Sequence, residues 1–433
     1  MLNTVAIFSL EVTPRLTYTL NEMFNRRLGL QYVVYTNQQE WENAPNPKIN
    51  YSHRAIETGV SITPNRLLFE TGIDTSRKPL VNKDDFWKWT IHFEQENFDP
   101  IAGVFYLLSR YEEYQNTKRD EHGRFSAADS LAQQHGFLAF PLVEHWCDRL
   151  GELLKEQEPQ LQIQPRTYKV YNTIDIDFAY LYKGLPIWRW TGKLIKSLVS
   201  LKWHKTIEQV LVTCGFSKDP YDTYEVISRE TNVKPHYFLL MANYGSVDYN
   251  INPQSNAMQK LLQKLNSHAL EIGIHPSYRS NSQINLLEEE KKQLEHLIGR
   301  PVNLARQHFL KLALPTTYHQ YTQQKITKDF SFGYADAIGF RASTCMSFNF
   351  YDLTIEMPQP LEIYTTNVMD VTLKHYLQLS PDEALKLSKN LTQVIKQYSG
   401  NFVCLWHNNS LNEADIWKNW KQVYLQLINQ PND

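Results

Sequence analysis

The sequence predicts an α/β protein in which a C-terminal (β/α) barrel follows a mixed α/β N-terminal domain. With 433 residues the chain is too long for one small core, and two domains are the natural expectation. From residue 167 onward, strand-like segments alternate with helical ones, which indicates parallel strands that close or nearly close into a barrel. Ionisable residues stand near the ends of these strands, where barrel proteins gather their chemistry.

The domain boundary is predicted at a polar, proline-containing stretch, residues 151–166. We therefore assign residues 1–160 to the N-terminal domain, whose role the sequence does not reveal, and residues 167–433 to the barrel. Within the N-terminal domain, residues 31–37 have the composition of a strand. The segment that follows Pro100 places its apolar residues on one helical face.

Two strongly polar segments come after that helical segment, at residues 110–114 and 120–124. We interpret them as a solvated helix end followed by a turn, with a binding site as the alternative. On the first interpretation both segments are exposed to water.

The barrel is predicted from the order of its elements. The expected strands are residues 167–178, 235–241, 271–275, 302–309, 329–334 and 401–408, and the expected helices are residues 256–270, 286–298, 384–398 and about 412–428. The strand ends carry Asp175, Asp177, His275, Arg306, His308, Asp329 and His407. Random placement would scatter such residues, so their common position predicts one site at the carboxyl ends of the strands.

Asp175 and Asp177 stand two residues apart on a strand, so their side chains point to the same side. Two carboxylates that close need a cation or a proton, and a divalent metal held by Asp oxygens and His nitrogens would satisfy them. Such a metal polarises a carbonyl and activates water, which predicts hydrolysis. One carboxylate can act as general base, and His407 is placed to protonate a leaving amine. Taken singly, His275 or His407 is more often a hydrogen-bonded core residue, and Asp-x-Asp is common where loops start.

Four motifs occur in a distinctive order along residues 167–430: Thr173-Ile174-Asp175, His275, Arg306 and Leu405-Trp406-His407. This order resembles the polysaccharide deacetylase superfamily, the carbohydrate esterase group that includes chitooligosaccharide and peptidoglycan deacetylases. The resemblance implies a deacetylase-type, TIM-like barrel, for which a seven-stranded and distorted form is expected, in a divergent two-domain bacterial subgroup.

The resemblance also implies a metal site in which Asp177 and His275 are ligands. The second metal-binding histidine of the family is replaced here by Arg279, which has no lone pair to give a cation. His308 is our candidate for the missing ligand. It lies two residues beyond Arg306, and strand alternation puts both side chains on one face. The alternative for His308 is a hydrogen bond within the barrel rim.

The remaining roles follow from the same resemblance. The implied catalytic residues are the base Asp175, the orienting Arg306, the proton donor His407 and the acid that tunes it, Asp329. Asp370 competes with Asp329 for the last role. Arg341, within residues 339–344, is a second candidate for the orienting arginine.

We therefore expect a hydrolase of carbon–nitrogen bonds other than peptide bonds, which removes acetyl groups from an N-acetylated sugar or glycan, with O-deacetylation as a close variant. The expected cofactor is a divalent metal ion, zinc first, with cobalt, nickel or manganese as alternatives. A catalytically inactive barrel that binds a glycan or a partner protein is the second hypothesis, and the loss of a histidine at Arg279 favours it. Hydrolysis of a glycosidic bond by paired carboxylates is the third, but it leaves His275 and His407 without a task.

Composition limits the partners and the compartment. The net charge of −2, from 44 basic and 46 acidic residues, gives no general attraction to nucleic acid. The four cysteines form no CxxC pair, which indicates reduced thiols rather than a disulfide framework. Because the start is unlike a signal peptide and no apolar run reaches about 18 residues, we expect a cytoplasmic protein.

Residues 181–210 are basic and aromatic, within an expected insertion near residues 181–230. They contain six basic residues, three tryptophans and one acid, Glu208. Their apolar residues recur at near-helical spacing, which favours an amphipathic helix on an anionic membrane surface, at the inner face of the membrane and near a lipid-linked glycan. A helical lid packed on the barrel is the alternative.

Overall fold

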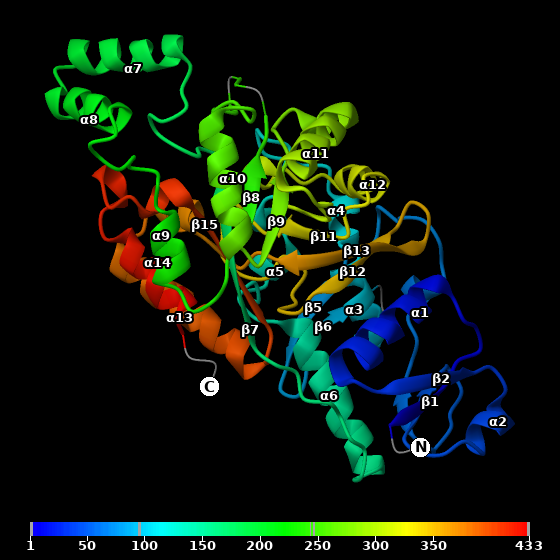
Figure 1. Cartoon of the computed structure of the whole chain (residues 1–433). Coiled ribbons are helices and arrows are strands. Elements are labelled where there is room, and N and C mark those ends of the chain that lie inside the picture. Colours follow the sequence, from blue (N-terminus) through cyan, green and yellow to red (C-terminus); the bar gives the residue numbers. More distant parts are fainter. Residues whose placement is uncertain (1–2, 94–96, 243, 246, 431–433) are drawn as a thin grey trace.

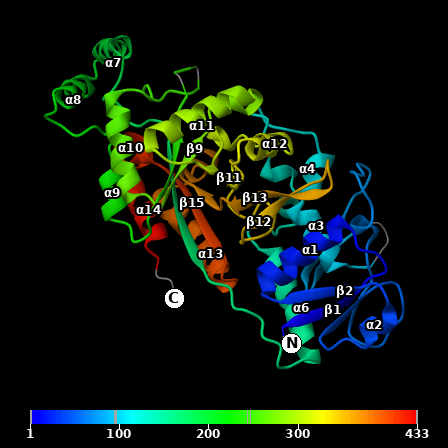
Figure 2. The ribbon, with the colours of Figure 1, turned by 45° about the vertical axis from the view of Figure 1, so that its right-hand side comes forward.

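The computed structural model of the protein describes residues 3–93, 97–242, 244–245 and 247–430. The chain forms a mixed α/β structure in which a small sheet comes from the N-terminal part and a large curled sheet from the C-terminal part (Figures 1 and 2). No helix within these described ranges is long and apolar enough to cross a membrane. The four cysteines, all described, are free thiols.

The N-terminal sheet is parallel throughout, in the order β2-β1-β3-β4. Its strands are β1 (Thr4–Phe8), β2 (Gln31–Tyr35), β3 (Lys48–Tyr51) and β4 (Val60–Ile62), and a separate hairpin pairs β5 (Leu80–Asp84) with β6 (Lys88–His92). The helices of this half are α1 (Pro14–Leu20), α2 (Gln38–Glu42), α3 (Pro100–Leu108), α4 (Tyr111–Gln115), α5 (Leu131–Gln134) and α6 (Leu142–Gln157). The predicted strand at 31–37 and the helix after Pro100 are confirmed as β2 and α3.

The large sheet has the order β12-β13-β11-β10-β9-β8-β7-β15-β14, and every neighbouring pair is parallel except β12 and β13. Its strands are β7 (Lys169–Ile176), β8 (His236–Leu240), β9 (Glu271–His275), β10 (Leu304–Ala305), β11 (Lys328–Phe332), β12 (Phe348–Asp352), β13 (Met357–Thr365), β14 (Val368–Met369) and β15 (Asn401–His407). The accompanying helices are α7 (Ile187–Val199), α8 (Trp203–Thr213), α9 (Tyr224–Arg229), α10 (Asn256–His268), α11 (Ile284–Ile298), α12 (Thr316–Gln323), α13 (Pro381–Gln397) and α14 (Trp420–Ile428).

The large sheet curls back on itself at the junction of β13 and β14. β13 pairs with β11, whereas β14, which starts three residues after β13 ends, pairs with β15. Between these two strands, the backbone N–H of Asn367 donates to the Val403 carbonyl at 3.0 Å. The side-chain Oδ1 of Asn367 accepts from the backbone N–H of Val403 at 2.8 Å. The carboxyl ends of the parallel strands therefore surround a common mouth. The count of seven barrel strands and the division into two domains stay predictions.

Apolar residues support this mouth from below. The five residues of β8, HYFLL, are all buried, as expected for a parallel strand covered on both faces. On the inside of the curl, Phe238, Leu304, Phe330 and Val403 form a small cluster of their own. The guanidinium of Arg306 lies over the Phe238 ring, 4.5 Å from its centre, at the top of this cluster. The inner cluster thus carries a charged residue directly beneath the strand ends.

Two predicted elements are shorter than expected. The strand at 302–309 is reduced to β10, and the chain then turns at Phe309 and Leu310, whose positive φ angles of 63° and 49° do not fit a sheet ladder. His308 therefore lies in a turn rather than on a strand. The terminal helix begins at Trp420 instead of near residue 412, since Glu413, Asp415 and Asn419 also have positive φ angles that interrupt a helix.

The interpretation of residues 110–114 as a solvated helix end is wrong. Arg110 and Glu113 are buried, and Glu113 accepts hydrogen bonds from Arg110 at 2.8 Å and from Arg341 at 2.7 and 2.9 Å. Arg341 therefore joins the N-terminal part to the large sheet and makes no bond to Asp175. Burial raises the pKa of Glu113, but the two arginines outweigh it and lower the pKa from 4.5 to about 2.

Replacing Glu113 by glutamine should destabilise the protein by about 3 kcal/mol or more at neutral pH, because Arg110 and Arg341 stay buried without their counter-charge. An acid with a lowered folded pKa stabilises the fold above its unfolded pKa, so this contribution is lost as the pH falls from 4.5 towards 2. Urea unfolding at pH 7 and at pH 3 measures both effects. The difference between wild type and Glu113→Gln should shrink at pH 3, and a constant difference would contradict the assignment.

Candidate functional site

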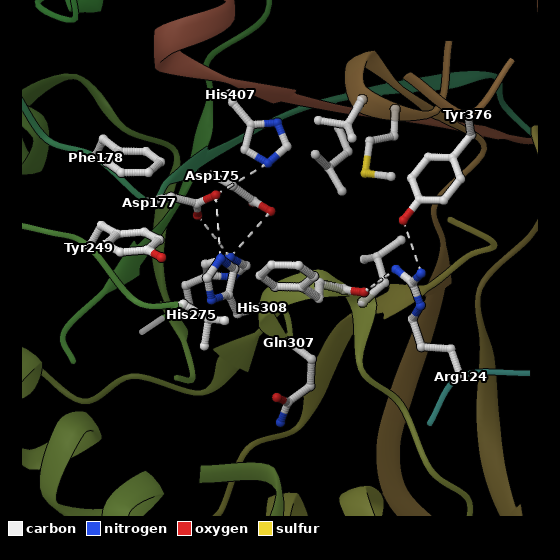
Figure 3. Close-up of a pocket in the computed structure, with 16 residues that line it drawn as sticks. Arg124, Asp175, Asp177, Phe178, Tyr249, His275, Gln307, His308, Tyr376 and His407 are labelled. Carbon is white, nitrogen blue, oxygen red and sulfur yellow. Dashed lines mark hydrogen bonds and ion pairs between the residues drawn. The ribbon is translucent and has the colours of Figure 1, made fainter. Parts of the chain in front are cut away.

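Five of the predicted site residues meet at the mouth of the large sheet: Asp175, Asp177, His275, His308 and His407 (Figure 3). Asp175 is the next-to-last residue of β7 and Asp177 follows that strand directly. His275 ends β9 and His407 ends β15. His308 reaches the same place from the turn after β10. Because β7 pairs with β8 and β15, and β8 with β9, these strand ends lie at one edge of the sheet.

Three of these residues, Asp177, His275 and His308, form a group that suits a metal ion, and we call them the metal group. Ligand atoms of Asp177, His275 and His308 all lie within 4.8 Å of one another. The Asp177 Oδ1 lies 3.1 Å from the His275 Nε2, and the Asp177 Oδ2 lies 3.6 Å from the His308 Nε2. One carboxylate and two imidazoles are a common ligand set for a divalent transition metal, with further positions left for water or substrate.

The state of the two imidazoles supports this fit. The His275 Nδ1 lies 2.6 Å from the Arg306 carbonyl oxygen, which can only accept, so this nitrogen carries a proton. In the neutral ring, Nε2 then presents a lone pair towards Asp177. Within the described residues, neither the His275 Nε2 nor the Asp177 Oδ1 has a hydrogen-bond partner, although both are buried. A cation between them would satisfy both acceptors.

His308 is held in the same way by a carboxylate. Its Nδ1 lies 2.8 Å from the Asp248 Oδ1, which leaves Nε2 directed at Asp177. Burial lowers the pKa of His308, but Asp177 and Asp248 outweigh it and raise the pKa to about 9. Burial raises the pKa of Asp177, yet His308 and His275 hold that pKa well below its usual range. Without a metal ion, these shifts correspond to an ionised Asp177 paired with a protonated His308, and a cation that binds there would displace the proton from the His308 Nε2.

Asp175 stands beside the metal group and is bound by an arginine. The Asp175 Oδ1 accepts from the Arg306 Nη1 at 2.8 Å, and the same guanidinium donates to the Thr173 hydroxyl and to the Phe330 carbonyl. The second oxygen, Oδ2, is 3.8 Å from the His275 Nε2 and faces the site. Arg306 therefore fixes the carboxylate while one oxygen remains directed at the metal group.

The acid that contacts His407 is Asp370. The expectation that Asp329 has this role is therefore wrong. The His407 Nδ1 lies 2.8 Å from the Asp370 Oδ1, and the Asp370 Oδ2 accepts from the His407 amide at 3.0 Å. Asp329 instead accepts from Ser331 and Tyr318, because it is the second residue of β11 and so lies near the amino end of that strand, away from the mouth. Burial lowers the pKa of His407, but Asp370 outweighs it and raises the pKa to about 10.

A cavity of about 230 Å³ opens over these groups. Its lining combines Asp175, Asp177 and the three histidines with the apolar side chains of Leu310, Met369, Val371 and Leu405. Leu310, Met369 and Leu405 belong to one small buried cluster. Phe309 also lines the cavity, and the left-handed backbone at Phe309 and Leu310 costs about 1–3 kcal/mol at each residue. Strain of this size is typical of sites where the turn must aim a side chain.

The N-terminal part contributes Arg124 to the wall of this cavity. Arg124 donates to the Phe309 carbonyl at 2.9 Å and to the Tyr376 hydroxyl at 3.0 Å (Figure 3), and it is paired with Asp120 at 2.7 Å. The alternative interpretation of residues 120–124 as part of a binding site is therefore the one that the geometry favours. Arg279, in contrast, is exposed and belongs neither to the cavity lining nor to the metal group.

Sequence reasoning missed the residues that hold the histidines from loops. Asp248 lies in a long loop between β8 and α10, where no strand or helix pattern draws attention to an acid. Tyr249, Phe178 and Tyr376 line the cavity, but aromatic residues are too frequent in this chain to stand out. Asp370 carried a usable signal, since it follows the short strand β14, which pairs with β15 beside His407.

The comparisons with known proteins add little to this picture. A family of unknown function (DUF7033) matches residues 5–159, the part that precedes the large sheet. No curated protein matches the sequence. Among solved structures, a proposed polysaccharide deacetylase from Mycobacterium smegmatis superposes with a TM-score of 0.39 at 11% identity, over 61% of this chain and 85% of that one. A superposition at this level carries no argument, so the function is inferred from the site.

Proposed function

We propose that this protein is a metal-dependent hydrolase that removes acetyl groups from an N-acetylated, or O-acetylated, sugar or glycan. The observation that carries the proposal is the convergence of the metal group with two further catalytic groups. Asp177, His275 and His308 lie within one ligand sphere, and Asp175 and His407 flank it. The order of motifs in the sequence points to the same activity.

The ligands would be Asp177, His275 and His308, and a divalent ion bound there, zinc first, would polarise the acyl oxygen and lower the pKa of a water molecule. Asp175, fixed by Arg306, accepts the proton of the attacking water on its free oxygen. His407 is favoured in its protonated form because Asp370 raises its pKa, and its Nε2 lies 3.6 Å from the Asp177 Oδ2. It therefore donates a proton to the leaving nitrogen or oxygen.

The shape of the cavity suits a small acyl group. The apolar lining residues Met369, Val371 and Leu405 would receive a methyl group, and the carbonyl and the bond that breaks would lie beside Asp175 and the histidines. Phe178 and Tyr249 are stacked at the wall, with ring planes 7° apart. Flat aromatic walls of this kind contact the apolar face of a sugar ring.

The loss of the family's second histidine favoured an inactive barrel, but His308 supplies a nitrogen in its place. Acetate release from N-acetylated oligosaccharides and from O-acetylated sugars tests the proposal directly. We expect release that requires one equivalent of zinc, cobalt, nickel or manganese and stops on chelation. A fully metal-loaded protein that releases no acetate from either class would favour the inactive, glycan-binding alternative.

A further inference from the structure

The clearest feature outside the site is a helical hairpin that stands away from the body. α7 and α8, joined at Leu201, project beyond the rest of the molecule in both views (Figures 1 and 2). The two helices are held to each other, since Trp190 donates to the Thr213 hydroxyl and Gln209 donates to the Trp190 carbonyl. No residue of α7 is buried. The hairpin is thus an ordered pair of helices with an uncovered outer surface.

This uncovered surface is strongly apolar. Ten of the 23 exposed large apolar residues in the described part of the chain lie within residues 187–216: Ile187, Trp188, Ile195, Val199, Leu201, Trp203, Ile207, Val210, Leu211 and Phe216. Helical spacing puts Ile187, Ile195 and Val199 on one stripe, and these side chains are 81%, 59% and 78% exposed. An exposed apolar surface of this kind is costly in water and indicates an occupant. A lid packed on the barrel, the alternative from the sequence, would have buried it.

The charge of the hairpin identifies the kind of occupant. Residues 181–210 contain Lys183, Arg189, Lys193, Lys196, Lys202 and Lys205 against Glu208, a net charge of 6 − 1 = +5 in a chain whose total is −2. On α7, Arg189, Lys193 and Lys196 recur at spacings of four and three residues, on the side opposite the apolar stripe. Trp188 and Trp203 stand at the starts of the two helices. Basic polar faces, apolar stripes and tryptophans together are typical of helices that lie in the interface of an anionic bilayer.

The hairpin is also connected to the site. A groove of about 390 Å³ runs along its base, lined by Trp188 and Arg189 of α7 and by Tyr244 from the body. Phe178 and Tyr249 line both this groove and the cavity over the metal group. Arg189 lies over the Tyr244 ring at 4.0 Å and donates to the Tyr249 carbonyl, so the hairpin base is fixed beside the cavity. A surface contacted by the hairpin therefore lies near a groove that shares lining residues with the cavity.

We infer that the α7–α8 hairpin docks this protein on an anionic lipid surface. Its apolar stripe enters the headgroup region, and the exposed Lys196 and Lys202 contact lipid phosphates. A second step rests on the proposed function: the groove then guides the acetylated sugar of a membrane lipid towards Asp175 and His407. The docking itself depends only on the surface of the hairpin.

The full chain should co-sediment with vesicles of phosphatidylcholine and phosphatidylglycerol at low salt, and much less with phosphatidylcholine alone or at high salt. Ile187→Ser/Ile195→Ser/Val199→Ser should weaken binding at least about tenfold, through lost apolar burial. Lys196→Glu/Lys202→Glu should weaken it at least about tenfold as well. The matched control Leu270→Ser/Ile355→Ser, at sites 54% and 52% exposed, should bind as wild type.

Absence of binding to anionic vesicles at low salt would overturn the inference, as would wild-type binding by both hairpin variants. A wild-type dimer that the triple serine variant dissociates, without vesicle binding, would show that a second copy covers the stripe and would also overturn it. Acetate release from a soluble substrate should be unchanged in the hairpin variants. A protein that docks but releases no acetate would contradict the proposed function and leave the docking intact.

Discussion

His308→Ala should abolish metal binding as completely as His275→Ala. Both imidazoles direct Nε2 at Asp177, and each is fixed through Nδ1 by a partner, Asp248 for His308 and the Arg306 carbonyl for His275. With one imidazole removed, Asp177 and a single nitrogen are left, too few ligands for a stable site with zinc. We expect metal near one equivalent in wild type and close to zero in both variants.

Elemental analysis after dialysis against each metal measures this difference, and the metal-induced rise in melting temperature is a second readout. His296→Ala is the matched control, because that imidazole is exposed on α11 and outside the group. Arg279→Ala should also retain metal, since Arg279 is exposed and takes no part. Full metal content in His308→Ala would reject the idea that it compensates for the missing histidine. A wild type that binds no metal under any loading would favour the inactive barrel.

The pattern of strand ends predicted most of the residues that meet at the mouth, but it also named Asp329, which lies near the amino end of β11. Regular parallel strands place Asp175, Asp177, His275 and His407. Such strands can be recognised in a sequence as apolar runs that end in polar residues. The side-chain position of His308 was expected from strand alternation, but it results from a turn with positive φ angles at the two following residues. A local sequence pattern does not encode such a turn, because its strain is compensated by distant contacts.

The partners of the histidines were harder to predict than the histidines. Asp329 and Asp370 each follow or occupy a short strand, and only the pairing of β14 with β15 brings Asp370 to His407. Asp248 and Arg124 come from a loop and from the N-terminal part, and both reach the site through contacts distant in sequence. The buried Glu113 shows the same limit, because its charge predicts exposure until Arg341 is known to lie beside it. Long-range pairing of charges is a property of the packed fold.

Asp175→Asn and His407→Ala should each retain the metal and lose most of the turnover. Neither residue belongs to the ligand group, so the site still forms, but the side-chain amide that replaces the Asp175 carboxylate has no basic oxygen to accept the proton of the attacking water. General acid–base groups contribute about 10² to 10⁴ in rate, so each variant should lose at least about 10² in kcat, or about 3 kcal/mol of transition-state stabilisation. For Asp175→Asn, KM should change little, because asparagine keeps the size and shape of the side chain that lines the cavity.

The matched variant Asp370→Asn tests the pKa of His407 separately from the hydrogen bond that holds its ring. It keeps an oxygen within reach of the His407 Nδ1 but removes the negative charge that raises the pKa of that ring, so the proton donor should be lost at lower pH than in wild type. The alkaline limb of the kcat profile should therefore move to lower pH, whereas His407→Ala should remove that limb altogether. Near-normal acetate release by Asp175→Asn or His407→Ala, with metal bound, would reject both assigned roles. Loss of metal in either variant would instead place that residue in the coordination sphere.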